Sequence, residues 1–293
     1  MSAPVIGFIG LGDIGMPMAR RILAAGHRLV AWNRSKDKLA GLCGQGAEAA
    51  ASPADVMARC DLVGLCLTAQ DAVREVAFGP GGLFEAPPGG GRKLVADFST
   101  GAPEAAAEFA RLAAEKGCGW VDAPVSGGVP GAEQGTLIVF AGGEASDVAA
   151  LAPLFSAFST RVTHMGPAGT GQMTKICNQM IVACSLLVVA ETMAAGRAAG
   201  IAVERLPAAL RGGFADSIPF QIFGPRMASH TFSPRLGAID LMRKDLSLGR
   251  AMAEKAGAGT PIRDLCAKLY DGAADGTADL AAVIGLFERM NGS

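Results

Sequence analysis

The most constraining feature of the chain is a glycine run between an apolar segment and an amphipathic one, 5-VIGFIGLGDIGMPMARRILAAG-26. It predicts a strand, then Gly10, Gly12 and Gly15 in the spacing G-x-G-x-x-G, then a helix. Gly10 would permit a tight turn, Gly12 would let a pyrophosphate approach the backbone, and Gly15 would let helix and strand pack closely. The helix start would offer free N–H groups to the phosphates. The alternative is a tight turn without a ligand. The residues expected at a dinucleotide are Gly10, Leu11, Gly12, Asp13, Ile14 and Gly15.

The type of dinucleotide is decided after the second predicted strand, at 31-AWNRSK-36. An acidic residue about 20 positions after the glycines would bind the ribose hydroxyls of NAD. Asn33 stands there instead, and Arg34 with Ser35 offers a cation and a hydroxyl to a 2′-phosphate. We therefore expect NADP to be preferred, with NAD possible. In the alternative interpretation Arg34 is a solvated surface residue or stacks on adenine.

Alternating apolar and amphipathic segments in the first half predict a parallel sheet with crossover helices. The expected strands are residues 5–9, 28–32, 61–67, 93–98, 120–122, 136–140 and 161–164. The expected helices are residues 14–25, 35–43, 69–77, 103–116 and 145–158. The pattern therefore predicts an α/β Rossmann dinucleotide-binding domain over residues 1–165.

After Gly171 the strand pattern stops, and residues 172–199 contain no proline and many helix formers. This central helix is expected to join the first domain to an all-α C-terminal domain over residues 166–293. Further helices are expected at 203–211, 238–255, 262–274 and 280–290. The middle of the central helix is apolar on every side, which indicates enclosure by protein and favours a homodimer or homotetramer. Its longest apolar run, residues 180–190, is too short to span a bilayer, so we expect no membrane segment.

Charge and composition exclude several other functions. Twenty-six basic and 27 acidic residues give a net charge of −1 without a basic block, so no nucleic-acid partner is expected. The seven cysteines form no Cys-x-x-Cys pair, which fits reduced thiols. Three scattered histidines predict no metal site. The N-terminal segment lacks the pattern of a secretory signal, so we expect a cytoplasmic protein.

Residues at the ends of two later strands are further candidates, because ligands of such sheets bind at the carboxyl ends of the strands. Leu67 and Thr68 follow the third strand, and Ser99 and Thr100 follow the fourth. Leu67, Thr68 and Thr100 are expected at the cofactor. Ser99 and Thr100 could equally be helix N-caps.

A glycine-rich loop follows the next strand, in 122-DAPVSGGVPGAEQGTL-137. Ser126, Gly127 and Gly128 offer a hydroxyl and unhindered backbone N–H groups, which would suit a small carboxylate. Glycine-rich turns are common, so the loop gains weight only from its place after a strand. We expect it to bind substrate.

One ammonium group stands at the start of the long apolar helix, in 169-GTGQMTKICNQ-179. Lys175 and Asn178 share a helix face, with Gln179 beside them. A purely structural lysine would extend to water. Near a nicotinamide, Lys175 could instead protonate the oxygen of a carbonyl that accepts a hydride, while Asn178 orients it. Lys175 and Asn178 are thus the catalytic candidates, and either amide could contact substrate.

Four blocks together identify a family: 15-GMPMARRIL-23, 122-DAPVSGGVPGAEQGTL-137, 169-GTGQMTKICNQ-179 and 244-KDLSLGRAMAEKAG-257. In this order they closely resemble the β-hydroxyacid dehydrogenases, which include 3-hydroxyisobutyrate dehydrogenase, tartronate semialdehyde reductase and glyoxylate/succinic semialdehyde reductase. The resemblance implies cofactor binding at Gly10, Gly12 and Gly15, carboxylate binding at Ser126–Gly128, and Lys175 as acid/base. It also implies a role for Lys244 near cofactor and substrate once the domains close.

Two details bear on the branch of the family. Many members carry two asparagines after the lysine, or one four positions after it, whereas Gln179 stands fourth here. The loop 212-GGFADSIPF-220 looks more like the tartronate semialdehyde reductase branch. The function expected is hydride transfer between NADP(H) and a short β-hydroxy acid or semialdehyde, in a cleft between the domains. The alternatives are an imine reductase, against which Lys175 argues, and a non-catalytic NADP(H)-binding module.

Overall fold

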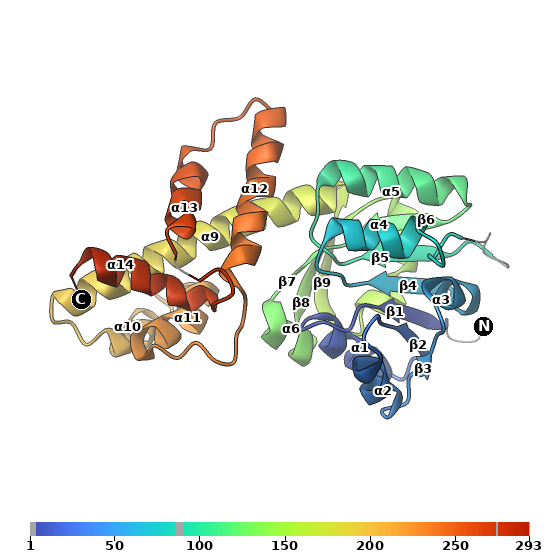
Figure 1. Ribbon diagram of the computed structural model, residues 1–293, viewed down its shortest axis with the longest axis horizontal. Coiled ribbons are helices and arrows are strands. Elements are labelled where there is room, and N and C mark those ends of the chain that lie inside the picture. Colours follow the sequence, from blue (N-terminus) through green and yellow to red (C-terminus); the bar gives the residue numbers. More distant parts are fainter. Residues whose placement is uncertain (1–3, 86–90, 274, 293) are drawn as a thin grey trace. The chain divides into compact units, whose positions relative to one another are not determined.

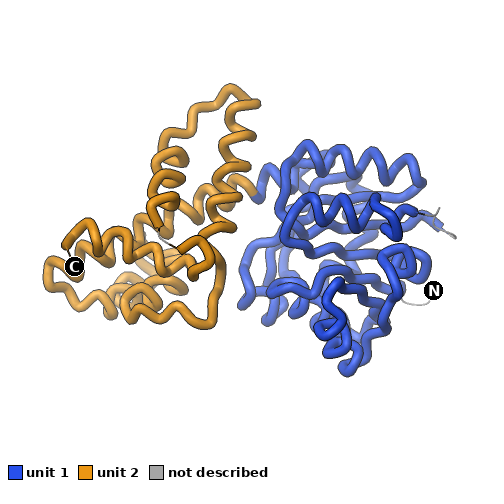
Figure 2. Tube along the Cα trace, in the orientation of Figure 1, with its two compact units in different colours: residues 1–175 blue, residues 176–293 orange. Residues whose placement is uncertain are grey.

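The computed structural model describes residues 4–85, 91–273 and 275–292. The chain divides into two compact units, Met1–Lys175 and Ile176–Ser293 (Figure 2). The division falls within one continuous helix, α9 (Thr170–Ala198), whose first six residues belong to the first unit. The boundary expected after residue 165 stays a prediction.

In the first unit, nine strands of the described residues form one sheet (Figure 1). They are β1 (Ile6–Ile9), β2 (Leu29–Trp32), β3 (Glu48–Ala49), β4 (Leu62–Leu65), β5 (Leu94–Asp97), β6 (Gly119–Asp122), β7 (Val125–Ser126), β8 (Leu137–Gly142) and β9 (Ser159–Gly166). The order is β3-β2-β1-β4-β5-β6-β8-β7, and β9 pairs with β8. The strands from β3 to β6 are parallel, whereas β6 and β7 both run antiparallel to β8. The order reverses between β1 and β4, where ligands of such sheets bind.

Helices cover both faces of this sheet. One core joins the strands to α1 (Gly15–Ala24), α2 (Lys36–Cys43), α6 (Gly128–Gln134), α7 (Ala145–Ala150) and α8 (Ala152–Phe155). A second core joins them to α3 (Pro53–Arg59), α4 (Gln70–Phe78) and α5 (Pro103–Glu115). Successive side chains of a strand point to opposite faces, so Phe8 lies in the first core and Ile9 in the second. Burial on both faces explains why these strands are almost continuously apolar.

The elements described in the second unit are all helices, joined by loops. The rest of α9 packs with η1 (Val203–Arg205), α10 (Leu206–Leu210), α11 (Ile218–Ser229), α12 (Ile239–Lys255), α13 (Pro261–Asp271), η2 (Leu280–Val283) and α14 (Ile284–Met290). Their shared core contains Leu186, Met193 and Tyr270, all fully buried. The fold class is thereby confirmed: a Rossmann-type domain, a long central helix and an all-α domain.

Helix α9 is only partly enclosed by its own chain, because Ile181 and Val188 expose 69% and 60% of their surfaces. The expectation that a second subunit covers the helix stays a prediction. The helix is also long and apolar enough, by length and composition alone, to cross a membrane. Its buried positions, such as Ala183 and Leu186, pack in the helical core, which favours a core helix. The absence of a membrane segment stays a prediction.

Three helices and two short strands were not expected. Helix α6 contains Gly128, Pro130 and Gly131, and α11 contains Pro225, so intrinsic propensity argued against both. Helix α3 begins at an N-cap that the sequence does encode, since the Ser52 hydroxyl accepts from the Asp55 N–H. Strands β3 and β7 have two residues each, too few for a periodic pattern.

Candidate active site

The three glycines of the first loop have different surroundings. Gly10 has φ +98°, and a Cβ there would lie 2.2 Å from the Cys66 carbonyl oxygen. A Cβ on Gly15 would lie 2.0 Å from the Gly10 carbonyl oxygen, so β1 and α1 meet backbone to backbone. A Cβ on Gly12 would meet nothing within 4 Å. The loop therefore leaves open space at the glycine where a pyrophosphate would approach, and the residues present fit a dinucleotide.

Asn33 connects this loop to the end of β2. Its Oδ1 accepts from the Leu11 N–H at 3.0 Å, and its Nδ2 donates to the Ser35 carbonyl at 3.0 Å. Its carboxamide thus ties the glycine loop to the segment that carries Arg34 and Ser35, both exposed. Asp13, on the glycine loop, is exposed as well. The sequence predicts Asn33 at the cofactor, and the structure shows that its side chain also bonds the backbone of Leu11 and Ser35.

The ends of β4 and β5 are joined by side-chain hydrogen bonds. The Leu67 N–H donates to the Ser99 hydroxyl at 3.0 Å, and the Ser99 N–H donates to Asp97 Oδ1 at 2.9 Å. Ser99 is buried, Thr100 is half-buried and Thr68 is exposed. The interpretation of Ser99 or Thr100 as an N-cap is wrong, because the N-cap of α5 is Ala102. Pro103 at the first helical position moves the helix start past both residues.

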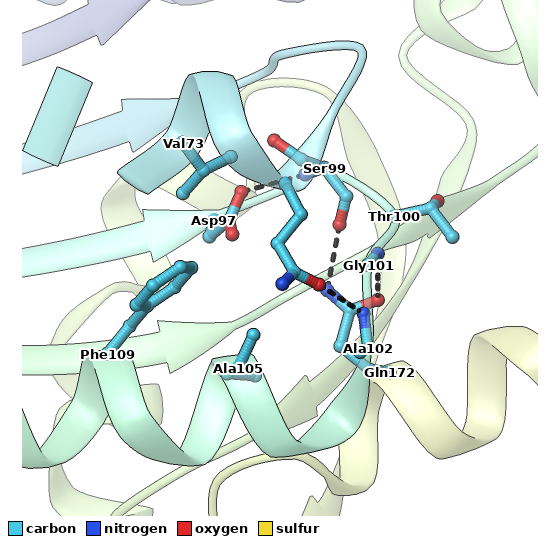
Figure 3. A pocket seen from close by; sticks show the side chains of 11 residues that line it. Val73, Asp97, Ser99, Thr100, Gly101, Ala102, Ala105, Phe109 and Gln172 are labelled. Carbon is cyan, nitrogen blue, oxygen red and sulfur yellow. Dashed lines mark hydrogen bonds between the residues drawn. The ribbon is translucent and has the colours of Figure 1, made fainter. Parts of the chain in front are cut away.

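Gln172, in the first turn of α9, contacts the same loop after β5. Its Nε2 donates to the Ser99 carbonyl at 2.8 Å, and its Oε1 accepts from the Gly101 N–H at 3.1 Å. Figure 3 shows its carboxamide between these two groups, beside a pocket that Asp97 and Thr100 also line. Gln172 was not a candidate from the sequence. Its partners lie more than 70 residues away in the chain, beyond any local pattern.

Two buried carboxyl groups stand next to each other at the ends of β5 and β6. Asp97 and Asp122 are register partners in the sheet. Burial raises the pKa of Asp97 to about 7, against the effect of its bonds to Ser99 and with a contribution from Asp122. Burial likewise raises the pKa of Asp122 to about 6, although hydrogen bonds from the Gly169 and Gln172 N–H groups oppose the change. Neither residue was a candidate from the sequence. The feature that could have identified them is an acidic residue at the end of an apolar strand.

The expected carboxylate loop begins in β7 and continues into α6. Ser126 is half-buried, and Gly127 and Gly128 are exposed. Their φ angles of +128° and +62° lie in the region that favours glycine, so this turn needs both residues. The first N–H groups of a helix have no intrahelical acceptor. The loop can therefore present a hydroxyl and backbone donors to an anion.

The three candidate side chains of α9 fall on either side of the division between the units. Lys175 is the last residue of the first unit, one turn after Gln172. Asn178 and Gln179 belong to the second unit. Asn178 Nδ2 donates to Gln179 Oε1 at 2.9 Å, and Gln179 Nε2 donates to Asp245 Oδ2 at 2.6 Å. Asp245, buried on α12, therefore orients both amides.

Lys244 also lies in the second unit, on α12. Its Nζ is 3.6 Å from Asp245 Oδ1, so it pairs with the carboxylate that holds Gln179. The structure thus brings Asn178, Gln179 and Lys244 together around Asp245. The part of the chain that the structure describes contains no cluster of three or more potential metal-ligating side chains. All seven cysteines are free thiols.

Comparisons with known proteins cover nearly the whole chain. Residues 5–166 match the family model described as the NAD binding domain of 6-phosphogluconate dehydrogenase, and residues 169–287 match NAD-binding of NADP-dependent 3-hydroxyisobutyrate dehydrogenase. The chain is 35% identical to 2-hydroxy-3-oxopropionate reductase of Escherichia coli, over 97% of both chains. It is 35% identical to NAD-dependent L-serine dehydrogenase of Pseudomonas aeruginosa, over 90% of both. The crystal structure of 3-hydroxyisobutyrate dehydrogenase from Salmonella typhimurium superposes with a TM-score of 0.87 at 27% identity, covering 96% of this chain and 99% of that one.

Proposed function

The chain belongs to the β-hydroxyacid dehydrogenase family, and we propose that it transfers a hydride between NADP(H) and a short-chain β-hydroxy acid or the matching semialdehyde. The substrate would be of the 3-hydroxyisobutyrate, tartronate semialdehyde or succinic semialdehyde type. One observation carries the proposal. Gln172 binds the loop after β5, at the edge of the sheet where the glycine loop also lies, and Lys175 follows one turn later. These contacts support the proposal that the Lys175 ammonium group acts near that edge.

Lys175 is proposed as the acid/base. A bound nicotinamide would supply the hydride in reduction and accept it in oxidation. As negative charge develops on the carbonyl oxygen, the Lys175 ammonium donates a proton to it; in oxidation the neutral amine takes the hydroxyl proton. The same group serves both directions because the two reactions share one transition state.

Asn178 is proposed as the amide that orients substrate. Gln179 uses its Nε2 on Asp245 and its Oε1 on Asn178. Its carboxamide is therefore engaged at both ends within the second unit. In this proposal Gln179 supports Asn178, which lies three residues after Lys175 and shares its helix face.

The preference for NADP rests on the end of β2. No carboxylate stands at Asn33, and the exposed Arg34 and Ser35 offer a guanidinium and a hydroxyl to a 2′-phosphate. The matching C-terminal family model is described as NADP-dependent, whereas one relative is named NAD-dependent. We therefore base the proposed preference for NADP on Asn33, Arg34 and Ser35 of this chain.

Ser126, Gly127 and Gly128 are proposed to bind the substrate carboxylate.

The protein is also proposed to form a homodimer or homotetramer. Ile181 and Val188 of α9 are largely exposed, as are Ile262 and Leu265 of α13. The two helices are in contact, since the Tyr270 hydroxyl donates to the Ala183 carbonyl, and exposed apolar side chains on neighbouring helices favour a protein interface. Light scattering that gives the mass of a single chain would contradict this proposal.

A substrate panel tests the proposed activity. NADPH oxidation would be measured with glyoxylate, succinic semialdehyde, tartronate semialdehyde, methylmalonate semialdehyde and a cyclic imine. We expect one carboxylate-bearing aldehyde to turn over and the imine to be inert. Turnover of the imine alone would replace the proposal with an imine reductase, and NADPH binding without turnover would indicate a non-catalytic module.

A further inference from the structure

The first turn of α9 is held by one buried carboxylate from the sheet. Asp122, fully buried at the end of β6, accepts from the Gly169 N–H at 2.7 Å and from the Gln172 N–H at 2.8 Å. The first N–H groups of a helix lack intrahelical acceptors, and negative charge at this end is favourable. A capping residue from the loop just before α9 would only bond the free N–H groups of the helix. Asp122 lies about 50 positions earlier in the chain, so this contact also fixes α9 against the strands.

Close backbone packing sharpens that placement. A Cβ on Gly171 would lie 2.5 Å from the carbonyl oxygens of both Asp122 and Phe140. A Cβ on Gly142 would lie 2.7 Å from the Gly171 nitrogen and 2.6 Å from an Asp122 carboxylate oxygen. The helix start therefore lies directly against the ends of β6 and β8, with no side chain between them to absorb a displacement.

Gln172 gives the same turn a second connection, to the loop after β5. Its two hydrogen bonds to Ser99 and Gly101 span the segment that carries Thr100 (Figure 3). Residues three apart on a helix are neighbours on its surface. Lys175 therefore projects from the helix face that Gln172 holds against this loop.

We propose that Asp122 is a positioning residue for proton transfer: by capping α9 it fixes the turn from Gln172 to Lys175 against the Ser99–Gly101 loop. This inference rests on the proposed role of Lys175 as acid/base. Asp122 touches neither substrate nor cofactor in this account and acts only through the helix. A misplacement of about 1 Å can cost about 100-fold in rate, so we expect a small shift of this turn on loss of the cap to slow the reaction.

Hydrogen exchange tests the structural step without any substrate. In Asp122→Asn an amide of the same shape offers one acceptor oxygen in place of two, so one of the two N–H groups loses its partner. We expect faster exchange in a peptide covering residues 166–176. The matched control is Asp147→Asn, another buried aspartate of the same unit, whose carboxylate pairs with Arg92. Unchanged exchange in Asp122→Asn would overturn the proposal.

Kinetics test the functional step, with the panel aldehyde that turns over fastest. Asp122→Asn should lower kcat by about 10- to 100-fold and shift the pH profile of kcat, while the Kd for NADPH changes by less than about threefold. A purely structural residue would lower thermal stability and leave the pH profile unchanged, as we expect for Asp147→Asn.

A double variant separates this inference from the proposed function. If Asp122 acts through Lys175, adding Asp122→Asn to Lys175→Ala should cause no further loss of rate. Multiplicative losses would overturn the positioning role. If Lys175→Ala keeps its rate, the proposed acid/base fails instead.

A second variant serves if Asp122→Asn fails to fold. Gln172→Met keeps the cap and removes both bonds to the loop, so the same lowered kcat and shift of the pH profile are expected. A native rate and a native pH profile would contradict the proposal.

Discussion

Replacing Asp97 by asparagine should make the protein more stable at alkaline pH. Burial raises the pKa of Asp97 from its ordinary value of 3.8 to about 7, because the ionised form is poorly solvated at the end of β5. A carboxyl whose folded pKa is raised contributes stability below its unfolded pKa, and this contribution is lost as pH rises through the folded pKa. Between about pH 4 and pH 7 the native protein should therefore lose up to about 4 kcal/mol from this group alone.

Asparagine removes the charge and keeps an oxygen that can accept from the Ser99 N–H. We expect Asp97→Asn to be more stable than the native protein at pH 8 by about 2–4 kcal/mol, with little difference at pH 4. The assay is urea unfolding followed by tryptophan fluorescence, since both tryptophans, Trp32 and Trp120, lie in the first unit. Asp147→Asn, which breaks the pair with Arg92, should lower stability at both pH values. An Asp97→Asn protein that is less stable at pH 8, or whose pH dependence equals the native one, would refute this reasoning.

Two further predictions concern the cofactor. Gly12→Ala should keep native thermal stability, because its Cβ meets open space, but should bind NADPH at least about 10-fold more weakly. Gly15→Ala should lose both thermal stability and NADPH affinity, since its Cβ would lie 2.0 Å from the Gly10 carbonyl oxygen. Fluorescence titration and thermal unfolding check the pair, and native NADPH affinity in Gly12→Ala would be incompatible with a pyrophosphate there. Arg34→Ala should raise the Kd for NADPH by about 10- to 100-fold and leave that for NADH nearly unchanged. An equal effect on both cofactors would mean that Arg34 stacks on adenine and does not select the 2′-phosphate.

Sequence reasoning predicted those parts of the molecule that are encoded locally. The glycine loop, the parallel strands and the long helix each follow from spacing or periodicity within about 30 residues. Helix α6 was missed because Gly128, Pro130 and Gly131 have low helix propensity, and its position is set by the neighbouring strands. Sequence patterns thus predict elements whose signal is local, and they miss an element whose position depends on distant neighbours.

The contacts that organise the candidate site lie outside that range. Asp122 and Gln172 meet their partners across about 50 and 70 residues, and Gln179 meets Asp245 across 66. In the sequence these are an acid after an apolar strand and two ordinary helix glutamines. Only the strand order, which places the ends of β5 and β6 side by side, shows what they hold in place. Lys175 could be selected from the sequence because an ammonium group in the first turns of an apolar helix is unusual in itself.

The central claim is that Lys175 moves the proton in the proposed reaction. The most direct measurement compares kcat/KM for the best panel aldehyde, and the Kd for NADPH, between the native protein and Lys175→Ala. Loss of a general acid should lower kcat/KM by about 10²- to 10⁴-fold while NADPH still binds within about threefold of the native affinity. A variant that reduces the aldehyde at close to the native rate would contradict the account and leave Lys175 as a structural residue of α9.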